Sequence, residues 1–231
     1  MGTRWVRAGV VAVAAVSLLG GVARAQDAEP SGDQEVVLRV GTNTDLGSDN
    51  VFAATSGADW VVATSQYDMM LKFDAADLSP APSLAEGCAP SEDYMTWTCT
   101  LREGLLWSDG EPLTSEDVAF SYRFVIDNDI SQYKSYFAFD PVFETPDERT
   151  LVWIAEKPTF ALDMPPWVYI VPEHVWAEYD GLDRKEIRGV PSTPAVTSGP
   201  FHMTEWQQGS SWTMTRNPNM FTATRRKPAC R

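Results

Sequence analysis

The clearest pattern of apolar and polar positions lies between residues 97 and 126. Every second residue from Trp97 to Leu101 is apolar and the residues between them are threonines, which is typical of a half-buried strand. From Val118 to Ile126 apolar side chains recur at i, i+4, i+7 and i+8, the spacing of one buried helical face. The pattern therefore predicts a strand, a connecting turn and an amphipathic helix.

Two short polar segments set the limits of this helix. The Ser-Asp-Gly sequence at 108–110 predicts a turn, because glycine tolerates a positive φ and aspartate bonds its own backbone. Thr114 and Asp117 form a capping-box pattern, in which the hydroxyl accepts from a first-turn amide and the carboxylate reaches back. We expect the helix to end near 127–129, where the sequence reads Asp-Asn-Asp.

Periodicity predicts further elements on both sides of this region. Apolar runs, turn residues and helical spacing mark their positions. The predicted elements are a strand over 35–41, a helix over 58–70, a hairpin over 143–154 with its turn at Pro146-Asp147, and strands over 201–206 and 211–217.

The first 25 residues have the features of a signal peptide. Arg4 and Arg7 precede a short apolar stretch at 8–19, and Ala-Arg-Ala at 23–25 is a small-x-small cleavage site. An uncleaved anchor is the alternative. Because no cysteine directly follows the apolar stretch, we expect an exported, non-lipidated protein, periplasmic or extracellular. Residues 26–35 are then a polar linker.

Composition and charge narrow the class of protein. The chain has 231 residues, of which 44% are hydrophobic and 22% charged, so we expect a globular monomer of one or two domains. Its formal net charge of −14 argues against a nucleic-acid partner, because phosphate backbones are bound by basic surfaces. Solubility is the simplest explanation of this charge.

The cysteines predict a disulfide and no metal site. Cys88 and Cys99 flank a polar, hairpin-like turn, and export permits oxidation, so we expect these two thiols to pair. Cys230 is left over. A zinc site is not expected, because four ligands at usable spacing are absent, and His174 and His202 lie far apart. We predict no cofactor, and we expect both histidines to be structural or solvated.

The order of residues in the central segment resembles a family signature. LREGLLWSDGEPLTSEDVAFSY, residues 101–122, resembles a segment of the extracellular solute-binding proteins of ABC transporters, family 5, the oligopeptide, dipeptide and nickel-binding type. Ser115 stands where alanine is usual in the family. Shorter resemblances to the same family fall at 67–73, 78–86, 168–176, 197–201 and 217–219.

The resemblance implies an α/β, periplasmic-binding-protein-like fold of class II type. Residues 36–56 and 195–219 would form the main subdomain of the first lobe, and residues 57–194 an inserted α+β subdomain. No counterpart of the second lobe is expected. Residues 220–231 are abruptly basic and set apart as an atypical tail, for which truncation or a frameshift is the expected explanation.

The resemblance also implies a function. We expect an exported solute-binding receptor component of an ABC importer, here an incomplete N-terminal fragment. Its solute would be peptides, and its partners would be a permease and its ATPase. Isolated, it should bind ligand weakly or not at all. The expected ligand contacts lie in loops of the resembled pattern: Asn43, Thr44, Tyr67, Ser198, Gly199 and Phe201. For Tyr67 a core position is the alternative.

Two other functions stay open at this point. Binding of a sugar or another small solute within the same family would suit the nine tryptophans, although most tryptophans at strand positions belong to a core. A secreted hydrolase is the second alternative. No nucleophile elbow, zincin helix, phosphate-binding loop or dinucleotide fingerprint occurs, so we expect a protein that is not an enzyme.

Overall fold

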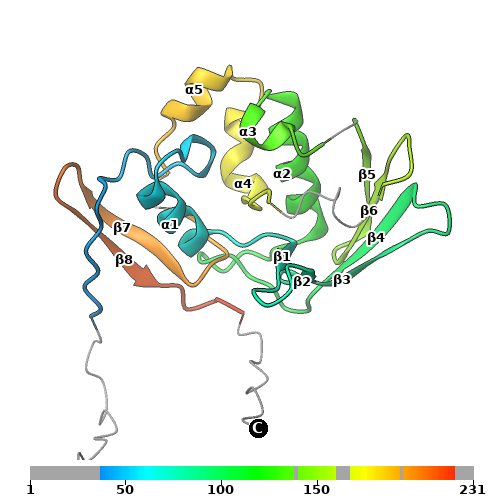
Figure 1. The fold of residues 1–231 in the computed structure, drawn as a ribbon, viewed down its shortest axis with the longest axis horizontal. Helices are drawn as coiled ribbons and strands as arrows, with labels where there is room; N and C mark the ends of the chain where they lie inside the picture. The colour runs from blue at the N-terminus through cyan, green and yellow to red at the C-terminus, as the bar shows by residue number, and fades with distance from the viewer. Residues whose placement is uncertain (1–36, 138–139, 160–166, 193–194, 222–231) are drawn as a thin grey trace, which may run out of the picture. The chain divides into compact units, whose positions relative to one another are not determined.

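The computed structural model describes residues 37–137, 140–159, 167–192 and 195–221 (Figure 1). The predicted signal peptide at 1–25, the linker at 26–35 and residues 222–231 of the tail lie outside the described residues. Residues up to Gly41 form a unit separate from residues 42–231, so the two are treated one at a time.

The predicted strand over 35–41 is wrong for its described part. Residues 37–41 have no regular secondary structure, and Val37, Leu38 and Val40 are exposed. A strand needs a neighbour that accepts and donates its backbone hydrogen bonds, and none of the described ladders includes these residues. Alternation of apolar residues alone was therefore insufficient.

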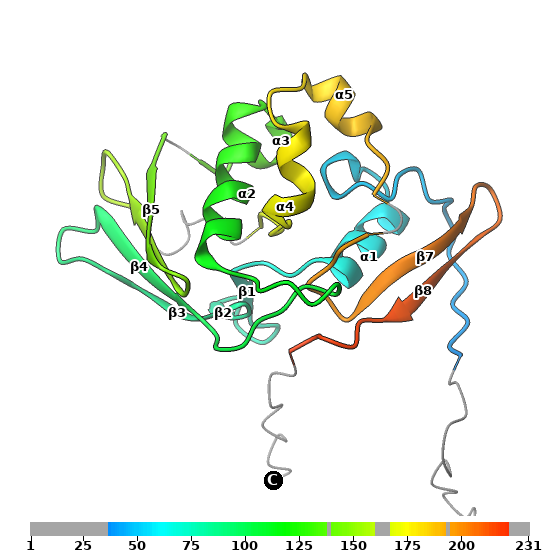
Figure 2. The same cartoon turned by 180° about the vertical axis from the view of Figure 1, so that it is seen from behind.

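The second unit is a mixed α/β structure with three antiparallel sheets (Figures 1 and 2). The strand orders are β1-β2, β3-β4-β6-β5 and β7-β8. The strands are β1 (Leu71–Phe73), β2 (Pro80–Pro82), β3 (Ala85–Pro90), β4 (Thr96–Leu101), β5 (Val142–Asp147), β6 (Thr150–Ile154), β7 (Phe201–Gln207) and β8 (Ser211–Arg216). The helices are η1 (Val51–Ala53), α1 (Gly57–Gln66), α2 (Ser115–Asp127), α3 (Ser131–Lys134), α4 (Glu173–Trp176), η2 (Ala177–Tyr179) and α5 (Arg184–Gly189).

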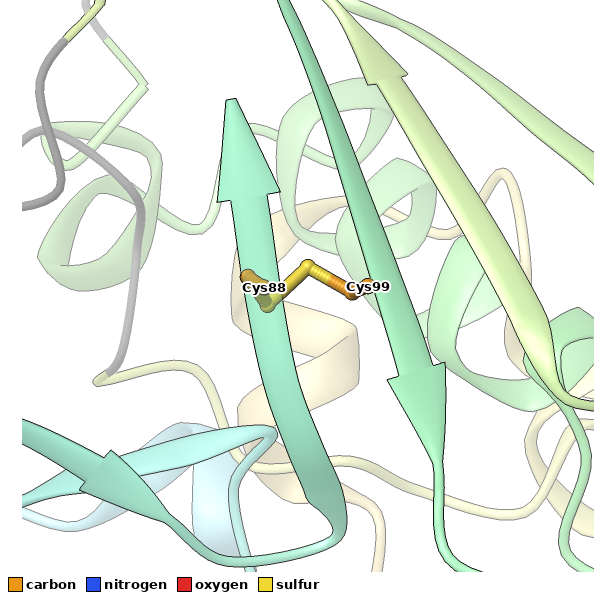
Figure 3. The surroundings of a disulfide bond; sticks show 2 residues. All are labelled: Cys88 and Cys99. Atoms are coloured by element: carbon orange, nitrogen blue, oxygen red, sulfur yellow. A yellow bond between two sulfur atoms is a disulfide. The ribbon is translucent and has the colours of Figure 1, made fainter. Parts of the chain in front are cut away.

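The predicted strand and disulfide are confirmed in the four-stranded sheet. Trp97, Cys99 and Leu101 of β4 are buried, and the two threonines between them are exposed. Cys88 of β3 lies directly opposite Cys99, and the two are joined by a disulfide (Figure 3). The pairing therefore follows from strand register, which brings the two side chains to one position across the ladder.

The predicted 143–154 hairpin forms, but its turn lies later than expected. Asp147 of β5 pairs with Thr150 of β6, so the turn is Glu148-Arg149 rather than Pro146-Asp147. β5 is an edge strand with an irregularity between Glu144 and Asp147, and such a position tolerates a proline without a ladder hydrogen bond.

The predicted central helix is confirmed as α2, with Thr114 as N-cap and a complete capping box to Asp117. The predicted apolar face is buried, as are Ser115, Ser121 and Phe124. The helix therefore buries more than one stripe. It contacts β5 and β6 on one side and α3 and α4 on the other.

The helix predicted over 58–70 is shorter than expected. α1 ends at Gln66, and Tyr67 is extended with φ −127° and ψ 139°. Tertiary hydrogen bonds explain this end: the Gln66 carbonyl accepts from the Gly199 amide at 2.8 Å, and Met69 bridges Tyr169. These contacts hold the chain after Gln66 in an extended conformation, so the helix ends there.

The hydrophobic core is strongly aromatic. Its main cluster extends from η1 and α1 through α2 to the four-stranded sheet and to Trp176 of α4. A second, small cluster joins Leu46, Ala58 and Val62 to Met203 of β7. The predicted strands at 201–206 and 211–217 are confirmed as β7 and β8, and β7 packs against α1. None of the helices in the described ranges is long and apolar enough to cross a membrane.

Candidate functional site

The motifs at 107–109, 197–199 and 217–219, far apart in the sequence, meet in one junction. The Ser108 amide donates to the Thr197 carbonyl at 2.9 Å, and the Thr197 amide donates to Ser108 Oγ at 3.0 Å. Asn217 is buried, and its amide nitrogen donates to the Gly199 carbonyl at 2.9 Å. Asn219 donates in turn to the Trp107 carbonyl at 3.0 Å. These polar side chains satisfy backbone groups and thereby fix the 197–199 loop.

The central signature has a similar structural role. Asp117 is buried, and its carboxylate accepts from the Thr114 amide at 2.9 Å, the Trp107 indole at 3.3 Å and the Glu173 amide at 3.0 Å. Gly110 has φ +97°, as the predicted turn requires. The signature therefore holds the start of α2 against the start of α4.

Two predicted site residues lie together at the end of α1. The hydroxyl of Ser198 accepts from the Asp68 amide at 3.0 Å. A Cβ on Gly199 would lie 2.6 Å from the Ser65 carbonyl oxygen and 2.7 Å from the Gln66 carbonyl carbon, so only glycine fits this crossing. Ser198 is buried, and both residues join the 197–199 loop to the helix end.

The other predicted site residues differ in exposure. Tyr67 is only 2% exposed, and burial raises the pKa of its hydroxyl. Phe201, at the start of β7, is exposed. Asn43 and Thr44 are also exposed, in a loop where the Thr42 hydroxyl donates to the Thr44 carbonyl. The role of all six residues as ligand contacts stays a prediction.

Asp59 fixes the loop that follows Asn43 and Thr44. Its carboxylate accepts from the amides of Gly47 at 2.8 Å and Ser56 at 2.8 Å, and also from those of Ser48 and Thr55. Burial raises the pKa of Asp59, but these backbone hydrogen bonds outweigh burial and hold the pKa below its ordinary 3.8.

An exposed aromatic surface was not identified from the sequence. It consists of Trp60, Tyr136 and Trp167, which are 37%, 41% and 47% exposed. Trp60 packs on the buried rings of Tyr133 and Tyr169, with centroids 6.4 and 6.3 Å away. We call the three exposed residues the aromatic surface. Tyr136 acts electrostatically on both buried tyrosines, and Trp167, two residues from Tyr169, packs on the ring of Phe73.

The helical spacing over 58–70 does not show which side of the helix is buried. Trp60 and Val61 are both exposed, and the small residues Ala58 and Ala63 face the core with Val62. The small side chains on the inner face of α1 let the helix pack against β7.

The described residues also form an open cavity of about 390 Å³ between α2, β5 and α4, lined by Glu116, Ala119, Phe120, Arg123, Phe143, Thr145 and Glu173. Arg123 is engaged by Asp140 and lies 5.1 Å from the centroid of the Phe143 ring. None of the predicted site residues lines it. Within the described part, no group of three metal-ligating side chains is found.

Comparison with known proteins gives a consistent result. Residues 79–229 match the bacterial extracellular solute-binding proteins, family 5 Middle. A Brucella ovis protein whose name describes it as an ABC transporter peptide-binding protein is 28% identical over 211 residues, which are 90% of this chain and 39% of that protein. The chain thus spans well under half the length of this relative.

Solved structures of the same kind share the fold. A mannohexaose-bound periplasmic oligopeptide-binding protein of Thermotoga maritima is 26% identical, with a TM-score of 0.64, covering 76% of this chain and 32% of that one. The Haemophilus influenzae OppA complex with the peptide RPPGFSPFR is 20% identical, with a TM-score of 0.64, covering 77% and 37%. The predicted class of fold is confirmed.

The family match extends beyond the resembled segments, to residue 229. The predicted atypical tail from residue 220 stays a prediction. The predicted division at 56/57 and 194/195 stays a prediction. α1 belongs to the predicted inserted subdomain and β7 to the predicted main subdomain. Their contact therefore joins the two predicted subdomains.

Proposed function

Because the chain belongs to the bacterial extracellular solute-binding proteins of family 5, we propose that it is a solute-binding component of an ABC importer, with oligopeptides as the solute. Its partners would be the permease and ATPase of that importer. It would act as a monomer and by binding, without catalysis. Apart from family membership, the aromatic surface around Trp60 of α1 is the observation that supports this function most.

The arrangement suits an extended peptide for a physical reason. Exposed tryptophan and tyrosine rings supply large apolar contact area with few rotatable bonds, and loop backbone groups supply hydrogen bonds that do not depend on ligand side chains. We propose that Asn43, Thr44 and Phe201 contact the ligand directly. The buried Tyr67, Ser198 and Gly199 would act mainly by fixing the backbone around them.

The family is extracellular, so the protein is exported. We further propose a periplasmic or extracellular, non-lipidated product with residues 1–25 removed. The support is the signal-peptide pattern and the lack of a cysteine directly after its apolar stretch.

Sugar binding is a second candidate, and one observation favours it. Flat exposed rings such as Trp60 and Trp167 stack on sugar faces as well as on peptide side chains, and the Thermotoga relative was solved with mannohexaose. Peptide binding is preferred because the Brucella relative is named as a peptide-binding protein, the Thermotoga protein is an oligopeptide-binding protein, and the Haemophilus protein was solved with a peptide.

The test is a titration followed by the indole NMR signal of Trp60, assigned with Trp60→Phe. A mixture of oligopeptides at millimolar concentration should shift this signal, with an affinity weaker than about 100 µM because solvent competes for each backbone hydrogen bond. A shift with mannohexaose alone would favour sugar binding. No shift with either ligand would refute the proposed site.

A further inference from the structure

Asp68 lies where three separated segments are joined, directly beside the candidate site. Its amide donates to Ser198 Oγ at 3.0 Å, and its carbonyl accepts from the Ile170 amide at 3.0 Å. The next residue, Met69, forms an antiparallel bridge with Tyr169. The backbone around Asp68 therefore connects the end of α1 to the 197–199 loop and to residues 169–170, which follow Trp167 of the aromatic surface closely in the chain.

The carboxylate of Asp68 is poorly satisfied for a charged group. Among the described residues, the only hydrogen bond to Oδ1 is a long one from Ser83 Oγ at 3.5 Å. Oδ2 is buried and has no hydrogen-bond partner among the residues that the structure describes. No ion pair of the described part includes Asp68. A buried ionised carboxylate with an unused oxygen is unfavourable, because the hydration that it loses is not replaced.

The neighbouring groups do not neutralise this charge. Lys72 on β1 attracts it from outside ion-pair distance, and Arg102 donates to the Ser83 carbonyl at 2.6 Å instead. Across the bridge, burial and then the charge of Asp68 raise the pKa of Tyr169 to about 12. Burial raises the pKa of Asp68 itself to about 6, against the smaller effects of Lys72 and Ser83.

We propose that Asp68 is a proton-controlled positioning residue, whose ionisation loosens the junction between residues 67–70, 168–170 and 198 and thereby displaces Tyr169 beneath the aromatic surface. The consequence for ligand binding rests on the proposed function, whereas the loosening of the junction does not. The protonated acid can remain buried as a neutral group and donate a hydrogen bond. The ionised acid gains solvation only when the junction opens.

The sign and size of the effect follow from linkage. The folded pKa of about 6 lies above the ordinary 3.8, so the closed junction is fully stabilised below pH 3.8 and loses that stabilisation as the pH rises through 6. If Asp68 regains its ordinary pKa in the open form, opening becomes about tenfold more favourable between pH 5 and pH 7.5.

Hydrogen exchange of the Ile170 amide measures the opening directly. The exchange rate, divided by the intrinsic rate at each pH, should rise about tenfold from pH 5 to pH 7.5 in the full chain. Asp68→Asn should abolish this rise, and the control Glu103→Gln, an exposed acid, should keep it. Ser83→Ala, which removes the one hydrogen bond that the described residues donate to the carboxylate, should shift the midpoint of the rise upward in pH.

The outcomes separate the two proposals. A normalised exchange rate that is equal at both pH values, or a rise that persists in Asp68→Asn, would overturn the role of Asp68. If Asp68→Asn does not fold, the wild-type profile and Ser83→Ala still decide the question. Exchange needs no ligand, so failure of oligopeptides to shift the Trp60 signal would refute only the proposed function.

Discussion

Replacing Gly199 with alanine should destabilise the protein strongly, because the added methyl group has no room. The new Cβ would lie 2.6 Å from the Ser65 carbonyl oxygen and 2.9 Å from the Gln66 carbonyl oxygen. These neighbours are backbone atoms at the end of α1, which cannot turn aside as a flexible side chain can. The 197–199 loop must therefore move away from the helix.

The magnitude follows from two losses. Overpacking of this kind costs about 1–3 kcal/mol. Moving the loop also lengthens the hydrogen bond from the Gly199 amide to the Gln66 carbonyl, now 2.8 Å, which contributes about 0.5–1.5 kcal/mol. We therefore expect Gly199→Ala to lower the free energy of unfolding by about 2–4 kcal/mol.

Urea denaturation followed by circular dichroism measures this change, and Gly57→Ala is the matched control. Gly57 begins α1, has no atom within 4 Å of an added Cβ and has no positive φ, so alanine there should be neutral or stabilise by up to about 1 kcal/mol. If the two variants unfold with equal free energies, the close approach of loop and helix is not what requires glycine at 199.

Three further changes test the packing around the site. Asp117→Ala leaves three N–H donors without their acceptor and should cost about 3 kcal/mol or more in urea unfolding, whereas Glu116→Ala in the same helical turn should cost less than about 1 kcal/mol; equal costs would contradict the role of Asp117. Replacing Cys88 and Cys99 together with alanine should lower the unfolding free energy by roughly 3 kcal/mol, the chain-entropy value for so short a loop, and dithiothreitol should lower wild-type stability similarly; an unchanged wild type in dithiothreitol would argue against the bond. The pKa of Asp59 is lowered in the folded protein, so its stabilisation is fully present above pH 3.8 and is lost as the pH falls through the folded pKa, which lies below 3.8. The stability difference between wild type and Asp59→Asn should therefore shrink in acid, and a constant difference from pH 7 to pH 2.5 would exclude this linkage.

Local patterns predicted the elements that local physics determines. The capping box of Thr114 and Asp117 and the alternation along β4 follow from hydrogen bonding and side-chain direction within a few residues. The Cys88–Cys99 bond was predictable for the same reason, since the register of one short hairpin decides it.

The errors occurred where a distant segment determines the local structure. α1 ends at Gln66 because its carbonyl bonds Gly199, more than a hundred residues away in the chain. Residues 37–41 have the residue pattern of a strand, but a strand forms only beside a second strand, and the pattern does not show whether one is present. No local rule contains this information.

The candidate site was predictable only in part. The resemblance pointed to the loop of Ser198 and Gly199, which does meet the end of α1. The exposure of Trp60 depends on which face of α1 packs on β7, and the unsatisfied carboxylate of Asp68 depends on three segments that meet only in the folded chain. Burial and pairing at such a junction cannot be read from spacing.

Photo-crosslinking tests the central claim, peptide binding at the aromatic surface, most directly. Oligopeptides that carry a photoreactive side chain would be irradiated with the full chain, and the labelled residues mapped by mass spectrometry, with unlabelled peptide as competitor. We predict competed labels at Trp60, Tyr136 and Trp167, lost on Trp60→Ala. Competed labels confined to the cavity around Glu116 and Arg123, or no competed label, would contradict the account.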